Sequence, residues 1–305
     1  MLSVDSGRRT QAATWLLLVA AGCAVLVLAV HEVFVQTSRG QLVDSAALEG
    51  AVIGRGRIIE PVRQVLEVVS VGSLAAAGLL AGAVALLRRR FLLAAVAVGV
   101  VVGSNVTTQV LKYQVLQRPD LGLSVEGMSG NTLPSGHTTV AMSVGAAFVL
   151  VAPSRLRALV AVLAAGYGAT TGVATLSAGH HRPSDAIAAC LVVGAWAAGL
   201  AALTVLVVPT REPVPGLSSG HQLVAGVLAA GAAGLLVVGA VATFGTARLL
   251  PADLDRAQLL VAYGGGAAMI AGTALAVVAS LMVVINQIVP PLPLAPRTRA
   301  EVLLA

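Results

Sequence analysis

Long apolar segments, separated by short polar loops, restrict this chain to a small set of folds. Of its 305 residues, 57% are hydrophobic and only 10% are charged, and the mean hydropathy is +0.93. A soluble domain carries about a quarter charged residues. The composition therefore excludes an ordinary soluble fold and predicts that the chain lies in a bilayer.

A membrane-spanning helix needs about 20 apolar residues, and eight segments of the sequence approach or exceed this length. They are residues 14–35, 62–87, 91–114, 137–152, 158–177, 184–208, 223–243 and 259–288. The first is longer than the apolar part of a signal peptide and no small-residue cleavage site follows it, so we expect it to be retained. The sequence thus predicts an all-α, polytopic transmembrane helical bundle.

The distribution of charge predicts the orientation of this bundle, because short cytoplasmic loops are rich in Lys and Arg. With the N-terminus inside, the cytoplasmic segments hold ten basic and three acidic residues, a net charge of +7. The remaining segments hold nine basic and ten acidic residues, a net charge of −1. We therefore expect a cell-membrane protein with both termini in the cytoplasm. The run Arg88–Arg90 is then a topology signal and not a nucleic-acid surface.

Two further features of composition bear on the environment of the chain. Cys23 and Cys190 lie inside apolar segments, which predicts buried or lipid-facing thiols and no disulfide. Lys112 is the only lysine among nineteen basic residues. This preference for arginine is typical of a GC-rich bacterial genome of actinobacterial type, and it makes Lys112 conspicuous.

Three polar segments from separate parts of the chain meet the same membrane face in the predicted topology. "VLKYQVLQRPDLG" ends the third span, "NTLPSGH" opens the fourth, and "SAGHHRPSD" joins the fifth to the sixth. Polar and charged groups at membrane depth are costly and are usually functional. The sequence therefore predicts a site on the extracytoplasmic face.

The residues of the first two segments are typical of an anion site. Lys112 and Arg118 supply positive charge, and arginine matches the geometry of phosphate oxygens. The backbone N–H groups of Ser135 and Gly136, at the start of a helix, would point at a bound anion. The pattern predicts a site for a phosphate group.

The third segment adds a nucleophile. Asp185 follows His181 by four residues, so its carboxylate can hold one ring nitrogen and leave the other free to attack. His137 on the same face is suited to general acid catalysis. These residues predict phosphoryl transfer through a phosphohistidine without a metal or cofactor, because the cationic groups can stabilise the transition state. His180 lacks the spacing to Asp185, and we expect it to line the pocket or to have a structural role.

At these positions the sequence resembles the type 2 phosphatidic acid phosphatase (PAP2) superfamily, whose motifs are K-x6-R-P, P-S-G-H and S-R-x5-H-x3-D. The second motif is complete at residues 134–137, and the third keeps His181 and Asp185. The resemblance implies a six-helix catalytic core and a lipid phosphatase. It also implies that His181 is the nucleophile, that Asp185 orients it, and that His137 protonates the leaving group.

The chain departs from the family pattern at two places. Five residues, not six, separate Lys112 from Arg118, and Thr175 occupies the position of the arginine in the third motif. We expect Arg182, beside His181, to fill part of that role. The proposed phosphate-binding set is Lys112, Arg118, Ser135, Gly136 and Arg182.

The resemblance also divides the chain. We expect a PAP2-like catalytic core at residues 1–208, a cytoplasmic linker at 209–222, and two additional helices with a short tail at 223–305. His221, at the end of the linker, repeats Ser-Gly-His without the companion motifs and is expected to be a solvated loop residue.

Two classes of function remain open. The first is a membrane lipid phosphatase that hydrolyses a lipid phosphate or diphosphate, with polyprenyl phosphates among the substrates that fit. The second is a degenerate relative that binds a lipid phosphate or a protein partner without turnover, as a scaffold or transport protein. The altered third motif favours the second class, and the intact His137, His181 and Asp185 favour the first.

The charge asymmetry makes the orientation testable. A cysteine introduced in the loop at residues 209–222 should be shielded from a membrane-impermeant thiol reagent in intact cells, whereas one introduced at residues 127–130 should be labelled. The protein without an introduced cysteine serves as the control for Cys23 and Cys190. The reverse labelling pattern would refute both the orientation and the outward-facing site.

Overall fold

The computed structural model describes residues 2–68, 91–123, 130–207 and 219–288, together with isolated positions between 69 and 90. Every regular element among these residues is a helix, as predicted. In chain order the elements are α1 (Leu2–Val30), η1 (His31–Val35), α2 (Ser38–Val52), α3 (Arg55–Val68), α5 (Phe91–Val110), η2 (Leu111–Val115), α6 (Gly136–Val151), α7 (Ser154–Ser177), α8 (Pro183–Val207), α9 (Ser219–Leu249) and α10 (Arg256–Ile288). η1 and η2 are single π-helical turns that continue α1 and α5.

Within the described residues, six helices are long and apolar enough to cross a membrane. They are Arg9–Val35, Phe91–Val115, Ser154–Ser177, Pro183–Val207, Gly220–Leu249 and Arg256–Val283. These helices match six of the eight predicted spans, and the chain is a multi-pass membrane protein. The predicted span at 137–152 corresponds to α6, an apolar helix of only 16 residues. The predicted span at 62–87 begins within α3, at residues 62–68, and the structure describes the remainder only at isolated positions, so this span stays a prediction.

Two short helices, α2 and α3, occupy a region expected to be an extracytoplasmic loop followed by the start of a span. Thr37 caps α2 by accepting a hydrogen bond from the Gly40 backbone N–H at 3.0 Å. Most of α2 is buried, including the polar residues Gln41 and Asp44. Because α2 mixes polar with small residues, a search for apolar segments passes over it. It is too short to span a bilayer.

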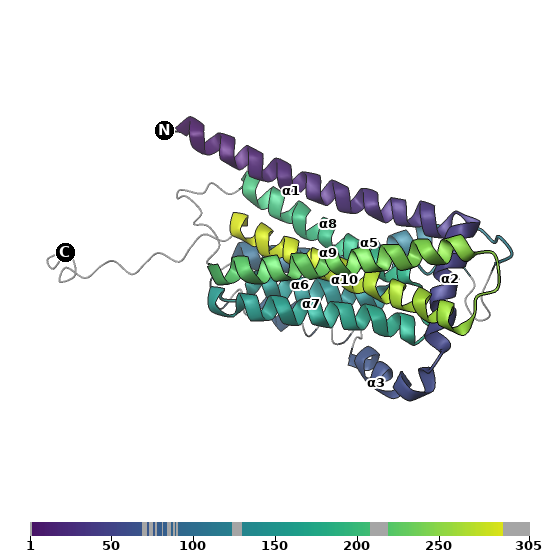
Figure 1. Cartoon of the computed structure of the whole chain (residues 1–305). Helices are drawn as coiled ribbons and strands as arrows, with labels where there is room; N and C mark the ends of the chain where they lie inside the picture. Colours follow the sequence, from purple (N-terminus) through teal and green to yellow (C-terminus); the bar gives the residue numbers. More distant parts are fainter. Residues whose placement is uncertain are drawn as a thin grey trace.

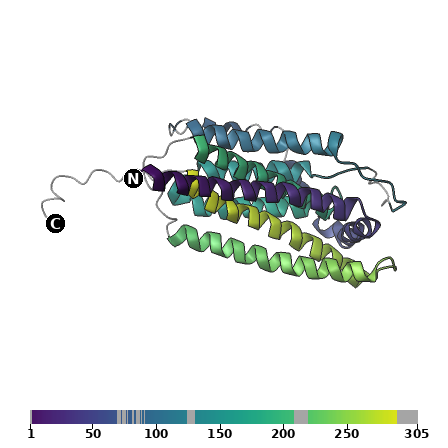
Figure 2. The ribbon, with the colours of Figure 1, turned by 90° about the horizontal axis from the view of Figure 1, so that it is seen from above.

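The long helices lie side by side in one bundle, and α2 crosses one end of it (Figure 1). The view from above shows α2 nearly end-on at that same end (Figure 2). α8 packs against α1, α5, α6 and α10. α10 in turn packs against α2, α7, α8 and α9. The two C-terminal helices therefore differ in position: α10 contacts the helices that carry the predicted site, and α9 packs mainly on α10.

Small residues allow α10 to approach its neighbours closely, as in other membrane helix bundles. A Cβ atom added at Gly266 would lie 2.6 Å from Cγ of Pro183, the first residue of α8, and 3.4 Å from Cβ of Ala47 in α2. One turn further along, Ile270 packs against Gly172 of α7. α10 thus closes against the start of α8 at a glycine.

This contact yields a prediction with an internal control. Gly266→Ala forces Pro183 or the α10 backbone to shift, and overpacking of this kind costs about 1–3 kcal/mol. Gly264→Ala should be neutral or slightly stabilising, because no atom lies within 4 Å of the added Cβ. Thermal unfolding in detergent should show a lower midpoint for Gly266→Ala only. Equal midpoints would show that α10 does not pack tightly on α8.

Candidate functional site

The predicted nucleophile and its carboxylate lie in contact at the start of α8. Nδ1 of His181 is 3.0 Å from Oδ2 of Asp185, and both side chains are buried. The contact arises locally: His181 lies two residues before Pro183, which begins α8, and Asp185 lies in the first turn of that helix. With Nδ1 engaged by Asp185, Nε2 is the ring nitrogen that remains for attack.

Asp185 connects several groups of the site. Besides His181, its Oδ2 atom accepts hydrogen bonds from Thr132 Oγ1 at 2.7 Å and from the Arg182 backbone N–H at 3.0 Å. Its backbone carbonyl accepts a further bond, from the Ser135 N–H at 2.9 Å. Asp185 therefore joins the segment around the P-S-G-H motif to the segment around His181.

The P-S-G-H motif forms the N-terminus of α6. Ser135 is the N-cap, and its Oγ atom accepts hydrogen bonds from the Thr138 backbone N–H at 3.4 Å and from Thr138 Oγ1 at 3.1 Å. Gly136 begins the helix, and a Cβ atom added there would meet only Gln109 Nε2, at 3.9 Å. His137 follows, partly exposed and close enough to His181 and Lys112 for their charges to act on it. The backbone N–H groups at this helix start carry the positive end of the helix dipole.

Arg118 contributes a buried donor. Within the described residues its Nη2 atom is buried and has no hydrogen-bond partner. Buried donors are nearly always satisfied, so this guanidinium fits a site where an anionic ligand completes the bonding. The charges of Arg182, Asp44 and Asp185 all act on it, which places it at the same end of the bundle.

The backbone on either side of Arg118 is held by the N-terminal part of the chain. The carbonyl of Gln117 accepts hydrogen bonds from His31 Nε2 at 3.0 Å and Gln36 Nε2 at 2.8 Å. The carbonyl of Pro119 accepts one from Gln41 Nε2 of α2 at 3.1 Å. These three side chains fix the position of Arg118, and sequence reasoning did not assign them this role.

Lys112 lies in η2, partly exposed, with its ammonium 5.7 Å from the centroid of the Tyr113 ring. Asn131 Nδ2 bonds to the carbonyls of Lys112, Leu116 and Leu133 and so ties η2 to the segment before the P-S-G-H motif. The first two motifs are therefore adjacent in space.

The two positions singled out in the third motif behave differently. Thr175 is buried, and its hydroxyl donates to the Gly172 carbonyl of its own helix at 2.7 Å. Arg182 is fully buried, and its Nη1 atom donates to Thr132 Oγ1 at 3.4 Å. Arg182 thus joins the hydrogen-bond network around Asp185, on the opposite side of His181 in the sequence from Thr175.

A third arginine reaches the site region from a distant part of the sequence. Arg55, the first residue of α3, donates from Nε to the Ser177 carbonyl at 3.1 Å. Its guanidinium lies against Gly179, whose φ of +76° suits glycine, and its charge acts on His180. No sequence signal links Arg55 to the motifs, because it follows a segment expected to be a loop.

His221 was expected to be a solvated loop residue, but it lies in the first turn of α9. The Nε2 atom of His221 is hydrogen-bonded to the carbonyl of Ser154, the first residue of α7. The His181 loop follows the opposite end of α7, so His221 is remote from the candidate site. Among the described residues, no group of three or more His, Cys, Asp and Glu side chains could hold a metal ion. Metal-independent chemistry remains a prediction.

Comparison with known protein families gives a match to part of the chain. Residues 90–213 match the family model of the PAP2 superfamily. The matched segment runs from α5 past the end of α8 and contains all three motifs. The match supports assignment to the PAP2 superfamily and a phosphatase-type function in general. No curated protein and no solved structure matches the chain.

The contact between Thr132 and Asp185 generates a prediction. Thr132→Val keeps the shape of the side chain and removes the donor to the carboxylate that orients His181. A hydrogen bond to a charged group contributes about 1.5–3 kcal/mol, so kcat should fall about tenfold or more in a phosphate-release assay. Thr132→Ser should retain most of the activity. Wild-type kcat in Thr132→Val would mean that Asp185 needs no support from Thr132.

Proposed function

We propose that the protein is a PAP2-type lipid phosphatase of the cell membrane, with its active site on the extracytoplasmic face. The observation that carries this proposal is the buried His181–Asp185 pair, tied through the Asp185 carbonyl to Ser135 of the P-S-G-H motif. The pair provides an oriented nucleophile, and the motif provides an anion-binding helix start beside it.

In the proposed reaction, the phosphate of the substrate binds Arg118, Lys112 and the N–H groups at the start of α6. Arg182 adds positive charge from within the network around Asp185. Nε2 of His181 attacks phosphorus while the Nδ1 proton is held by Asp185. The bond from phosphorus to the leaving oxygen breaks, and His137 donates a proton to that oxygen.

The second half of the reaction returns the enzyme to its starting state. Water attacks the phosphohistidine, and His137 now accepts the proton from that water. The bond between phosphorus and Nε2 breaks, and inorganic phosphate leaves. The fixed cations and N–H groups stabilise the charge that develops on the phosphate oxygens in both steps.

The location of the site at one end of a membrane bundle favours a substrate with a phosphate headgroup and an apolar tail. Polyprenyl phosphates and diphosphates, phosphatidic acid and phosphatidylglycerol phosphate all meet this description. Each would place the phosphate at the helix ends and the tail in the bilayer.

One observation favours the alternative of a degenerate member that binds without turnover. The position of the family's third-motif arginine is Thr175, whose hydroxyl bonds within its own helix and offers no charge to a ligand. Such a protein would bind lipid phosphates with intact Arg118 and Lys112 and would release no phosphate.

A phosphate-release assay with purified protein in detergent separates the two. We expect turnover on at least one member of a panel of lipid phosphates, no turnover in His181→Ala, and a strong reduction in His137→Ala. Activity should survive EDTA and be inhibited by vanadate, a phosphate mimic. Binding of lipid phosphates by wild-type protein without release of phosphate would instead establish the degenerate alternative. Loss of activity in EDTA, restored by a divalent cation, would contradict the metal-independent mechanism.

A further inference from the structure

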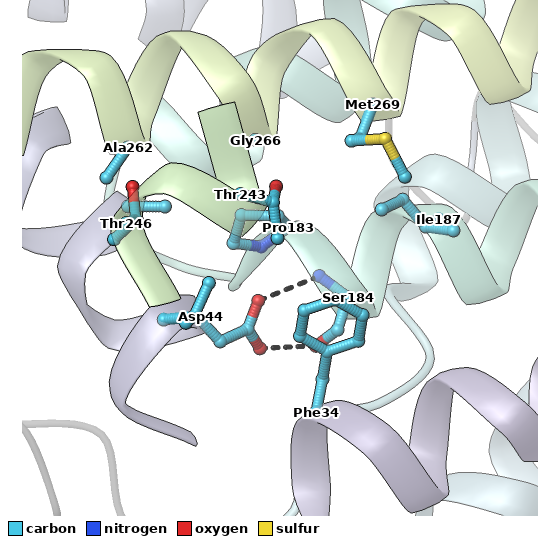
Figure 3. Close-up of a pocket in the computed structure, with 12 residues that line it drawn as sticks. Phe34, Asp44, Pro183, Ser184, Ile187, Thr243, Thr246, Ala262, Gly266 and Met269 are labelled. Carbon is cyan, nitrogen blue, oxygen red and sulfur yellow. Dashed lines mark hydrogen bonds between the residues drawn. The ribbon is translucent and has the colours of Figure 1, made fainter. Parts of the chain in front are cut away.

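A second carboxylate, Asp44, contacts the residue that precedes Asp185 in the chain. It belongs to α2, it is 2% exposed, and it accepts two hydrogen bonds from Ser184. One comes from the Ser184 backbone N–H at 3.2 Å, and the other comes from the Ser184 hydroxyl (Figure 3). Ser184 is the residue before Asp185 in the first turn of α8. Asp44 thus serves as an N-terminal cap for α8 that is supplied by another helix.

Ionisation of the Asp44 carboxyl group is disfavoured in the folded protein. Burial, with a smaller contribution from the charge of Asp185, raises the pKa of Asp44 from 3.8 to about 7, although Ser184 and Arg182 act in the opposite direction. A carboxylate whose folded pKa exceeds its unfolded pKa makes folding less favourable as pH rises between the two values. Ser, Thr or Asn would cap the helix without a buried charge. A buried group with a perturbed pKa is a candidate for a role in activity.

The surroundings of Asp44 connect it to the C-terminal helices. Asp44 and Ser184 line a small pocket with Thr243 and Thr246 of α9 and Gly266 of α10 (Figure 3). The pocket has a volume of about 20 Å³, which is room for a single water molecule. The pocket, together with the contact between Gly266 and Pro183, shows that α2, α9 and α10 pack around the first turn of α8. None of these three helices lies within the segment matched by the family model, residues 90–213.

We propose that Asp44 is a positioning residue of the active site: through Ser184 it fixes the first turn of α8, and so fixes the direction in which Asp185 holds His181. The inference rests on the proposed phosphatase function. Both hydrogen bonds that Asp44 accepts come from Ser184, so it acts on the chemical step through the first turn of α8. The charged groups whose fields reach it are Asp185, Arg182 and Arg118.

The test compares Asp44→Asn with the wild type. Asparagine has nearly the same shape, but it accepts only one of the two Ser184 bonds with its oxygen, and it lacks the charge. Because small displacements of catalytic groups have large effects on rate, kcat should fall about threefold to tenfold with KM within about threefold. Asp44→Ala, which leaves both Ser184 donors unpaired, should lower kcat further.

The stability of Asp44→Asn should increase although its kcat falls, and loss of a merely structural residue would not produce this combination. Asp44→Asn removes the buried charge, so its thermal midpoint should exceed that of the wild type at pH 8. The difference should be smaller at pH 5, where Asp44 of the folded wild type is protonated. Thr246→Val is the matched control: it lines the same pocket, its hydroxyl bonds to Ala242 of its own helix, and kcat should be unchanged.

The outcomes separate this inference from the proposed function. An active wild type with an equally active Asp44→Asn and Asp44→Ala overturns the inference alone. A loss of stability in Asp44→Asn at pH 8, with kcat per folded protein unchanged, assigns Asp44 a structural role and also overturns it. If Asp44→Ala does not fold, Ser184→Ala replaces it, and wild-type kcat in that variant counts against the inference. A wild type inactive on every lipid phosphate overturns the proposed function, and the inference with it.

Discussion

The carboxylate of Asp185 is the group on which the rest of the candidate site depends. Its Oδ2 atom is hydrogen-bonded to His181, Thr132 and the backbone N–H of Arg182. The backbone carbonyl of the same residue accepts a hydrogen bond from the backbone N–H of Ser135. A buried charge is tolerated only where several donors surround it. Those donors come from the segments before α6 and before α8, so satisfying one carboxylate brings two separate motifs together.

Hydropathy and local spacing account for what could be predicted. Apolar length located the six long helices, because a bilayer admits few alternatives to a helix of that length. The contact between His181 and Asp185 could be predicted for a different reason: the two residues lie within five consecutive positions at the start of α8, so their distance is a property of the local sequence. Ser135 as the N-cap of α6 is likewise local.

The residues that sequence reasoning missed are those whose roles depend on contacts between distant segments. Thr132 bonds across to α8, Gln41 reaches Pro119, and Arg55 reaches Ser177. Asp44 lies in α2, whose mixed polar and small residues give neither an apolar run nor a strong amphipathic pattern. Such residues acquire their environment only when the helices pack, and no spacing within the sequence encodes that environment. Arg182 was expected as a phosphate ligand, and its burial within the network around Asp185 could not be inferred from its place in the loop.

The anchoring of Arg118 has a consequence for how the fold can be divided. The carbonyls on both sides of this arginine are held by His31, Gln36 and Gln41, all of which precede the segment that matches the family model. A fragment of residues 90–213 would keep every motif residue and yet leave these backbone positions without their partners. The boundaries of sequence similarity and the boundaries of the working unit therefore differ in this protein. Transplanting the three motifs into another helical bundle would transfer the chemical groups without the supports that hold them in place.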